Sequence, residues 1–427
     1  MNEVLKENRR VYIEQIKKVI LPYWLSRGVD EEYGGFFTNF KPDGRELIST
    51  NKFAWPQGRM TWTFARLACT KANIFSDEER ARFLALAKHG ARFILEHCIT
   101  ADYTCHLVMD RQGKALDAGI GLGSTGNTFA DCFASFGLSA CAEAASDREM
   151  METAYQLYLS VAKRVREGKF IVAPYLIPGG FEHHAIYMVM VSLTSELYQS
   201  LTFFGDPRAC EVDAAGKAYC EHILTHFAQP EGIVLEQVRV DGRPSDNLLG
   251  RHFNAGHVIE SMWFVAASCS RRNEVENKRK AFDLLWNTYS MAKDEECGGI
   301  FYFLDKEGGK PAGPHIFPED AKAASNFEKE WAVKLWWAHT ETLYGLLLGY
   351  MENKDPKWFK EYKAIHDYVI NTYPNPDREV GEWIQLRDRY GSLLESFGGG
   401  VPQKSPYHAV RNLLMSIELL DEQISKS

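Results

Sequence analysis

Three histidines, one arginine and one glutamate stand at or beside the starts of apolar helical segments. His184, His257 and His408 each begin such a segment, Arg59 is the second residue of another, and Glu330 immediately precedes a fifth. Histidine transfers protons near neutral pH, and the positive end of a helix keeps an imidazole neutral and available as a base. Arginine stabilises the anion that remains when a proton is removed. These residue types predict a proton-transfer site, provided that the fold brings them together.

The helical segments recur along the chain with a period of about 70 residues, which is typical of a repeat architecture. Six of them are rich in small and aromatic residues and begin at Gly58, Thr128, His184, His257, Trp331 and His408. Helices that are apolar nearly all round are buried, whereas the stretches between them, such as 76–98 and 279–293, have one polar face and are expected outside. An open solenoid needs a polar capping repeat, and the last segment is as apolar as the others. We therefore predict an all-α fold, a closed (α/α)6 barrel, as one domain over residues 1–427.

Short extended runs form a second repeating feature. Residues 30–37 (DEEYGGFF) and 294–303 (DEECGGIFYF) are near copies of each other, and related runs begin at Cys105, Ile233 and Gly381. A β-branched or aromatic run that ends in Asp-Gly or a similar pair is typical of a hairpin. Each repeat should thus contain an outer helix, a hairpin or loop, and an inner helix. If the inner helices are parallel, their N-termini lie together at one end of the barrel. The three histidines, Arg59 and Glu330 would then lie at that end.

Two other motifs are better explained by structural roles than by a cofactor or metal site. Residues 121–126 match Gly-x-Gly-x-x-Gly, but no clear βαβ unit surrounds them, which favours a chain reversal over a dinucleotide site. The pairs His183–His184 and His252–His257 have no carboxylate or third histidine at a known metal-binding spacing. We therefore predict no metal and no nucleotide cofactor.

The composition limits the partners and the compartment. The formal net charge of −8 gives no electrostatic reason to expect nucleic acid. No segment approaches the length of a membrane span or the apolar core of a signal peptide. The nine cysteines are odd in number and never form a CxxC motif, which fits a reducing compartment and not a disulfide framework. We expect a cytoplasmic protein with a small-molecule ligand and no membrane or nucleic-acid partner; a homodimer is left open.

Five segments along the chain carry longer motifs. They are 33–45 (YGGFFTNFKPDGR), 55–62 (WPQGRMTW), 250–263 (GRHFNAGHVIESMW), 330–341 (EWAVKLWWAHTE) and 406–411 (PYHAVR). The central one resembles the GRHxNPGHxxExxW signature of the N-acylglucosamine 2-epimerase family, also known as renin-binding proteins, and the fourth resembles that family's EWAxKLWWPHxE motif. The family fold is an (α/α)6 barrel, so the resemblance implies the fold that the repeats predict.

The resemblance also implies roles for individual residues. His257 and His408 would be the acid/base pair, and Arg59 would lie at the reacting end of the sugar. The residues expected to bind the substrate are His184, Glu260, Glu330, Trp337 and His339. Inverting C2 of a ring-opened aldose requires removal of a proton next to the C1 carbonyl and its return to the opposite face, so two groups on opposite walls are the simplest arrangement. The expected reaction is the interconversion of N-acetyl-D-glucosamine and N-acetyl-D-mannosamine without a cofactor.

Departures from the family pattern keep the substrate open. After Trp383 the chain reads IQLRDRYG where the family often has FGYLxRxG, and Gln403 stands where cellobiose epimerases tend to have a tryptophan. Residues 310–327 look like an added loop that could act as a lid. A D-mannose 2-epimerase and a mannose/fructose isomerase are therefore alternatives within the family.

Two alternatives belong to other functional classes. A glycan hydrolase or lyase on the same barrel would need two carboxylates in the pocket, and Glu260, Glu330 and Glu382 keep this hypothesis open. The other is a non-catalytic binding protein, as the name renin-binding protein suggests.

Overall fold

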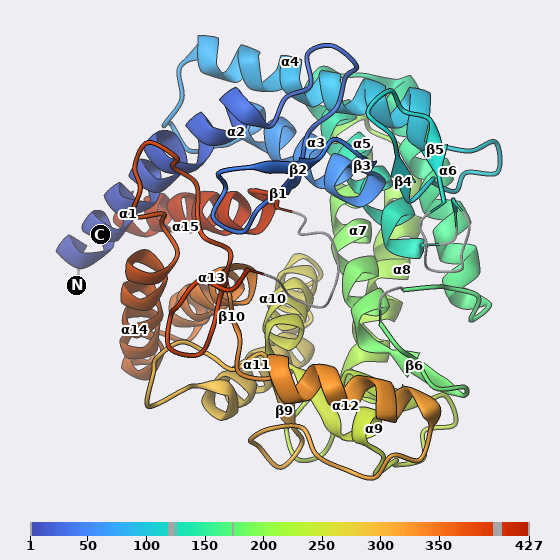
Figure 1. The fold of residues 1–427 in the computed structure, drawn as a ribbon, viewed down its shortest axis with the longest axis vertical. Coiled ribbons are helices and arrows are strands. Elements are labelled where there is room, and N and C mark those ends of the chain that lie inside the picture. The colour runs from blue at the N-terminus through green and yellow to red at the C-terminus, as the bar shows by residue number, and fades with distance from the viewer. Residues whose placement is uncertain (1, 118–123, 126, 173–174, 396–403, 426–427) are drawn as a thin grey trace.

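The computed structural model describes residues 2–117, 124–125, 127–172, 175–395 and 404–425. In this part of the chain, six helices surround the centre of the molecule and a second set of helices lies outside them (Figure 1). Each inner helix packs against the next, and the last packs against the first, so the ring is closed. The chain therefore has the all-α (α/α)6-barrel fold that the repeats predict. The inner helices are α3 (Ala54–Cys69), α5 (Thr128–Ala145), α7 (His184–Phe203), α10 (Ala255–Arg271), α13 (Trp336–Asn353) and α15 (Tyr407–Ser425).

The outer helices alternate with the inner ones along the chain, and three of the outer segments contain a π-helical stretch. Both outer stretches predicted above are confirmed as α4 and α11. Ser76 and Glu79 form a capping box at the start of α4, which explains where that helix begins. The outer segments are α1 (Asn2–Glu14) with η1 (Gln15–Ile20) and α2 (Leu21–Arg27), α4 (Asp77–Phe93) with η2 (Ile94–Cys98), α6 (Arg148–Arg166), α8 (Arg208–His222) with η3 (Ile223–Phe227), α11 (Val275–Ala292) and α14 (Pro356–Thr372).

Small residues allow the inner helices α3 and α5 to approach very closely. A Cβ atom added to Gly58 would lie 2.0 Å from the carbonyl oxygen of Phe133, and one added to Gly137 would lie 2.4 Å from the carbonyl oxygen of Gly58. Only glycine fits at these two positions without a shift of the backbone. The close approach also sets the position of Arg59, the next residue on α3, against Phe133.

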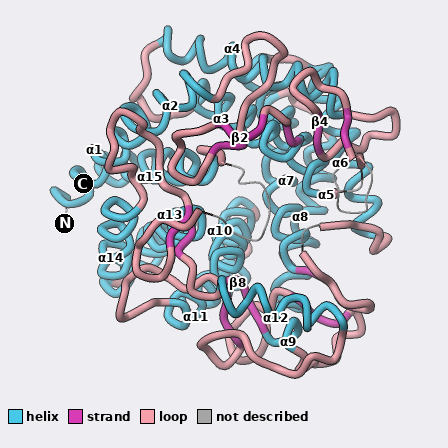
Figure 2. Tube along the Cα trace, in the orientation of Figure 1, coloured by secondary structure: helices cyan, strands magenta, loops and turns pink. Residues whose placement is uncertain are grey.

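Short strands link neighbouring repeats around one end of the ring (Figure 2). A strand directly before an inner helix pairs antiparallel with the strand that follows the next outer helix, as in β8 and β9, where Phe253 faces Leu304. These pairs fix the starts of the inner helices relative to each other. The strands are β1 (Asn39–Phe40), β2 (Leu47–Ser49), β3 (Lys52–Phe53), β4 (Val108–Met109), β5 (Ala115–Leu116), β6 (Phe181–His183), β7 (Gln237–Arg239), β8 (His252–Asn254), β9 (Phe303–Asp305), β10 (Lys334–Leu335) and β11 (Leu386–Arg387).

The two near-copy sequences at 30–37 and 294–303 form equivalent structures. The buried carboxylate of Asp30 accepts a hydrogen bond from Lys52 Nζ at 2.8 Å, and that of Asp294 accepts one from Lys334 Nζ at 2.9 Å. Arg111 and Arg389 add further bonds to Asp30 and Asp294, respectively. Each lysine comes from the strand before an inner helix, so the same buried ion pair ties a loop to the barrel in both repeats.

Three predictions about local structure are wrong. The fifth inner helix begins at Trp336 and not at Trp331, because β10 interrupts the apolar run and pairs with β11. Residues 310–327 are not only a loop: α12 (Pro318–Glu330) occupies most of that segment and packs on the short helix α9 (Leu248–Arg251) through its apolar side. The run that begins at Ile233 forms no hairpin on its own, because its strand β7 pairs with β6.

No helix among the described residues combines the length and the hydrophobicity needed to cross a bilayer. All nine cysteines are free thiols, and six of them are buried. Cys69 and Cys210 are exposed, and Cys297 is partly buried. The buried thiols are Cys98, Cys105, Cys132, Cys141, Cys220 and Cys269.

Candidate active site

The inner helices α10 and α15 each place one histidine near their N-terminus. Asn254 caps α10 and accepts a hydrogen bond from the backbone N–H of His257 at 3.2 Å. His408 is the second residue of α15. Both imidazoles are almost fully buried, with 6% and 4% of their residue surface exposed. The structure thus confirms that both histidines lie at the end of the ring where the inner helices begin.

A carboxylate orients the His257 ring. Nδ1 of His257 lies 2.8 Å from Oε1 of Glu236, a buried residue just before β7. The hydrogen bond makes Nδ1 the protonated nitrogen of the neutral ring and leaves Nε2 to exchange protons. The Tyr175 hydroxyl lies 3.4 Å from that Nε2. His257 is therefore held by one nitrogen and can react with the other.

His408 has the same arrangement with another carboxylate. Its Nδ1 lies 2.7 Å from Oε1 of Glu341 on α13. Unlike Glu236, this oxygen also accepts hydrogen bonds from Arg411 at 2.5 Å and Asn412 at 2.7 Å. Arg411 also bonds to Glu260 at 2.5 Å. The guanidinium shares the negative charge of both carboxylates, so less of it acts on His408.

Both imidazoles lie close to the indole ring of Trp337. Their ring centroids are 5.4 Å (His257) and 5.5 Å (His408) from the indole, at interplanar angles of 36° and 41°. Trp337 is the second residue of α13 and is only partly buried. An aromatic ring close to two proton carriers is a suitable surface for the apolar face of a sugar.

The surroundings shift the pKa values of the two histidines in opposite directions. Burial disfavours the charged form of His257, but the Glu236 carboxylate outweighs it and raises the His257 pKa above its ordinary value. Burial lowers the pKa of His408 well below its ordinary value, and the cations Arg59 and Arg411 lower it further. These shifts favour the protonated form of His257 and the neutral form of His408, so near neutral pH His257 is suited to donate a proton and His408 to accept one. The expectation that a helix N-terminus keeps both rings neutral does not hold for His257.

Arg59 points into a box of aromatic rings and not toward a carboxylate. Its guanidinium lies 4.9 Å from the ring centre of Trp55, 4.3 Å from that of Phe133 and 4.9 Å from that of Tyr407. The Nε atom is buried without a hydrogen-bond partner, and burial lowers the Arg59 pKa to about 10. Arg59 and Glu260 line one small cavity of about 20 Å³ inside the barrel. An arginine that keeps unused donors in an apolar box is suited to bind an oxyanion.

Glu330 lies in a second cavity, of about 220 Å³, and not in the one lined by Arg59. The residue ends α12, and it shares the cavity with Tyr175, His183, Glu236 and Tyr302. This cavity reaches the Glu236 side of His257. Among the described residues, Arg59 and Glu330 therefore line different cavities, and not the single cavity expected for all five of these residues.

His184 and His339 are buried in the protein interior. Nε2 of His184 lies 3.0 Å from the Ser261 hydroxyl, and its Nδ1 lies 3.9 Å from Glu236. Both nitrogens of His339 are occupied: Nε2 accepts from the Ile300 backbone at 3.0 Å, and Nδ1 lies 2.7 Å from the Leu335 carbonyl. Burial lowers the His339 pKa to about 3. The structure places His184 beside Glu236 and assigns His339 to packing below the start of α13.

Four residues of this group were not singled out from the sequence: Tyr175, Glu236, Glu341 and Arg411. Helical spacing offered a signal for two of them. Glu341 follows Trp337 by four residues on α13, and Arg411 follows His408 by three on α15, so each pair shares one helix face. Glu236 and Tyr175 come from extended segments and loops, and only the tertiary fold brings them to His257.

The other motifs do not join the site. Residues 121–123 and 126 of the glycine-rich motif, and Gln403, lie outside the described residues. Glu382 forms a buried ion pair with Lys404 at 2.7 Å. His252 makes its 2.6 Å hydrogen bond to the Leu249 carbonyl. Glu260, Glu341 and His408 lie close enough together to hold a metal ion, but the Arg411 guanidinium already neutralises both carboxylates.

A closed ring of six helix pairs with two buried histidine–carboxylate pairs at one end defines an (α/α)6-barrel protein equipped for proton transfer. Solved structures share the fold: a sugar epimerase from a ruminal bacterium has a TM-score of 0.76 at 19% identity, over 97% of this chain and 99% of that one. A D-mannose isomerase has a TM-score of 0.73 at 17% identity, over 96% and 97%.

The sequence comparisons point to one family. The model of the family described as N-acylglucosamine 2-epimerase (GlcNAc 2-epimerase) matches residues 215–412. The N-acylglucosamine 2-epimerase of Bos taurus is 28% identical over 413 residues, which are 95% of this chain and 90% of that protein. These matches are to the N-acylglucosamine 2-epimerase family, the family that the sequence motifs resemble.

Proposed function

We propose that this protein is a sugar 2-epimerase that interconverts N-acetyl-D-glucosamine and N-acetyl-D-mannosamine in their ring-opened forms. The observation that carries the proposal is the placement of His257 and His408 close to Trp337, each with Nδ1 on a carboxylate. The family match and the name of the bovine relative support the choice of substrate.

The proposed reaction needs only proton transfers. Near neutral pH, Nε2 of the neutral His408 removes the proton from C2, and the electrons of the broken C–H bond move toward the C1 carbonyl to give a 2-acetamido enolate. Protonated His257 then delivers a proton from Nε2 to the opposite face of C2, which restores the carbonyl with inverted configuration. Each positioned acid or base contributes roughly 10²–10⁴-fold to the rate. In the reverse reaction, neutral His257 removes the proton and protonated His408 returns it.

Other residues have supporting roles in this proposal. Arg59 stabilises the enolate oxygen on C1, because its guanidinium has a buried Nε without a partner and lies in a site of low polarity. Trp337 packs against the sugar, and Glu330 contacts the polar groups that enter the cavity beside Glu236. Glu260 positions Arg411 and His408, and His184 positions Glu236. His339, expected to bind substrate, supports the start of α13 instead.

Exchange with solvent tests the proposal. The protein is incubated in D2O with N-acetylglucosamine, N-acetylmannosamine, glucose, mannose and fructose in separate reactions, and the products are followed by NMR. We expect deuterium at C2 and the epimer as the product of the N-acetylated sugars. Turnover of mannose to fructose or glucose instead would identify the isomerase or the mannose epimerase. Release of a new reducing end from an oligosaccharide, with no exchange in a free sugar, would contradict the epimerase.

We also propose that the protein works in the cytoplasm. Nine free thiols are compatible with a reducing compartment. Fractionation of the cells that produce the protein, followed by detection with an antibody, checks this proposal; recovery in an extracytoplasmic fraction would contradict it.

A further inference from the structure

A cluster of one carboxylate and two imidazoles lies outside the candidate active site. Glu182 belongs to β6, His222 ends α8, and His226 belongs to η3. Nε2 of His222 lies 2.8 Å from Oε2 of Glu182, and Nε2 of His226 lies 3.8 Å from the same oxygen. One potential ligand atom from each residue lies within 4.8 Å of the other two. Histidines four residues apart on one helical turn, facing a carboxylate, are a common arrangement of zinc ligands.

The charge and hydrogen bonding of this cluster are incomplete. Among the described residues, Glu182 forms ion pairs with these two histidines and with no lysine or arginine, although its side chain is only 18% exposed. Nε2 of His226 is buried and has no hydrogen-bond partner. A buried polar atom without a partner is costly unless a ligand satisfies it. The cluster of Glu260, Glu341 and His408 differs, because Arg411 supplies its positive charge.

We propose that Glu182, His222 and His226 bind a divalent transition-metal ion of the zinc type. Two imidazoles and one carboxylate are ligands of intermediate softness, which favours zinc over calcium or magnesium. Bonds of about 2.0–2.2 Å to a tetrahedral ion place its ligand atoms roughly 3.3 Å apart. The present separations of 2.8 and 3.8 Å to the Glu182 oxygen lie on either side of that value. Small side-chain rotations therefore suffice, and water completes the fourth position.

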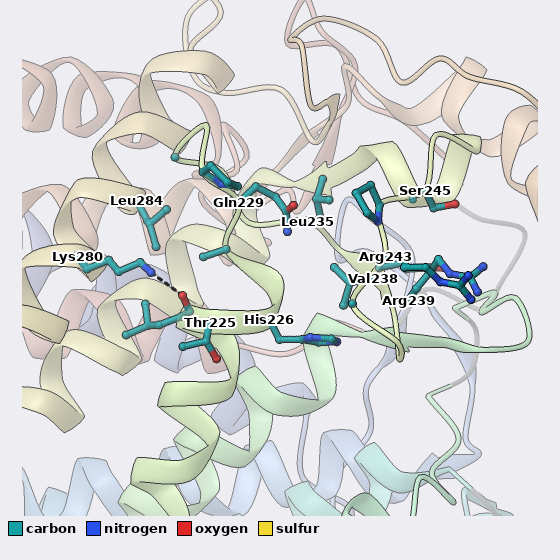
Figure 3. Close-up of a pocket in the computed structure, with 18 of the residues that line it drawn as sticks. Thr225, His226, Gln229, Leu235, Val238, Arg239, Arg243, Ser245, Lys280 and Leu284 are labelled. Carbon is teal, nitrogen blue, oxygen red and sulfur yellow. Dashed lines mark hydrogen bonds between the residues drawn. The ribbon is translucent and has the colours of Figure 1, made fainter.

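Neighbouring side chains hold the ligands and leave a path for the ion. The Tyr187 ring lies 4.4 Å from the His222 ring, and its hydroxyl interacts with the Glu182 carboxylate, as residues around a metal site commonly do. His226 also lines an open cavity of about 740 Å³ between η3, β7 and α11, where Figure 3 shows its ring beside Thr225 and Val238. An ion can enter from this cavity.

The position in the fold indicates what the ion would do. Successive residues of a strand point to opposite faces, and His183, next to Glu182 on β6, lies 3.5 Å from Glu236 in the active site. An ion on Glu182 would tie the end of the outer helix to the strand that carries His183, without contact with the reacting groups. The expected role is stabilisation of this end of the barrel, not participation in proton transfer.

Zinc titration of the full-length protein tests the site. The protein is stripped with EDTA, dialysed and alkylated at its accessible thiols, which removes Cys69 and Cys210 as competing ligands. We expect one zinc ion per chain by calorimetry, and at least a ten-fold weaker affinity in His226→Ala and in Glu182→Gln. His97→Ala is the matched control, because His97 is 30% exposed and lies 3.9 Å from Glu96; its affinity should equal that of the unmodified sequence.

A second readout separates loss of the site from misfolding. Zinc should raise the Tm of the wild type and of His97→Ala but not that of His226→Ala or Glu182→Gln, and Co2+ in the wild type should give the visible spectrum of a tetrahedral ion. Circular dichroism of the metal-free variants confirms that they are folded. Equal zinc affinity in all four proteins, or no binding by the wild type at millimolar zinc, would overturn the proposal. Sugar turnover is not part of the test, so the result is independent of the proposed epimerase activity.

Discussion

Nδ1 of His257 lies 2.8 Å from Oε1 of Glu236, and among the described residues no arginine or lysine shares this carboxylate within ion-pair distance. At His408, by contrast, Arg411 shares the negative charge of Glu341. One imidazole is therefore stabilised in its protonated form and the other in its neutral form. A proton donor and a proton acceptor are thus present together at neutral pH.

Replacement of Glu236 by glutamine should reduce kcat by roughly 10- to 100-fold, because the orientation and the basicity of His257 both depend on the carboxylate. The His257 pKa should fall. The alkaline limb of the pH–rate profile, where His257 loses its proton, should therefore move to lower pH. Steady-state kinetics between pH 5.5 and 9 measures both effects. Glu167→Gln, an exposed change at the end of α6, is the control and should change neither. An unshifted profile for Glu236→Gln would show that Glu236 does not set the His257 pKa.

The stability of the fold should decrease as the pH is lowered from 7.5 to 5.5. Burial holds the pKa of His183 and that of His339 at about 3, whereas a histidine in the unfolded chain titrates near 6.5. Between these values the unfolded state binds more protons, so acid favours unfolding by about 1.4 kcal/mol per such histidine at one pH unit below 6.5. His408 acts in the same direction.

His257 acts in the opposite direction, because its folded-state pKa is raised. Its contribution is fully present below about pH 6.5 and is lost as the pH rises through the folded-state value. Burial also lowers the pKa values of His226, His252 and His366. One histidine thus opposes six, so the free energy of unfolding should fall by roughly 3 kcal/mol or more over this range. Urea unfolding at several pH values measures it. His339→Leu should reduce the pH-dependent loss by about 1 kcal/mol, whereas stability that is flat across the range in the wild type would contradict these assignments.

Gly58→Ala should destabilise the protein by about 1–3 kcal/mol, because the added Cβ would lie 2.0 Å from the Phe133 carbonyl oxygen. The helices α3 and α5 would have to separate, and Arg59 would move with α3, so kcat should fall as well. Gly179→Ala is a matched control, since nothing lies within 4 Å of its Cβ position; it should change stability by less than about 0.5 kcal/mol. Equal Tm values for the two variants would show that α3 and α5 can accommodate a methyl group at position 58.

Removal of metal ions should leave sugar turnover unchanged, because the proposed reaction uses only side-chain proton carriers. The measurement is activity after exhaustive EDTA treatment and dialysis, with and without added zinc or manganese. The Glu182–His222–His226 cluster does not alter this expectation, since an ion there would affect the Tm and not the proton transfer. Activity that is lost with EDTA and restored by one of these ions would place a metal in the reaction.

The sequence predicted the barrel because its repeats are long and because six apolar helices can bury their surfaces only against one another. It located His257, His408 and Arg59 because equivalent positions of parallel helices converge. It did not find Glu236, which contacts His257 only because β7 pairs with β6 and brings its preceding residue inward. The start of α13 was placed at Trp331 because an apolar run has the same hydrophobicity in the strand β10 as in the helix that follows.

Loss of Arg59 should reduce the formation of the enolate from both epimers. Arg59→Met keeps much of the side-chain volume among Trp55, Phe133 and Tyr407 but removes the positive charge. We expect deuterium exchange at C2 to slow by roughly 10²-fold or more, whichever epimer is supplied. Arg66→Met is a control for loss of an arginine on the same helix, because Arg66 binds Glu143 and Glu196 farther along α3. Exchange in Arg59→Met at the wild-type rate would remove Arg59 from the reaction.

The central claim is that His257 and His408 serve opposite faces of C2, and deuterium exchange in His257→Asn and His408→Asn tests it most directly. Each variant is incubated in D2O with each epimer separately, and binding of an unreactive sugar alcohol confirms that the site is intact. Net epimerisation should fall by at least roughly 10²-fold in both variants. Each variant should still exchange the C2 hydrogen of one epimer, and the two variants should act on different epimers. Exchange of both epimers by either variant at near wild-type rates would contradict the two-histidine mechanism.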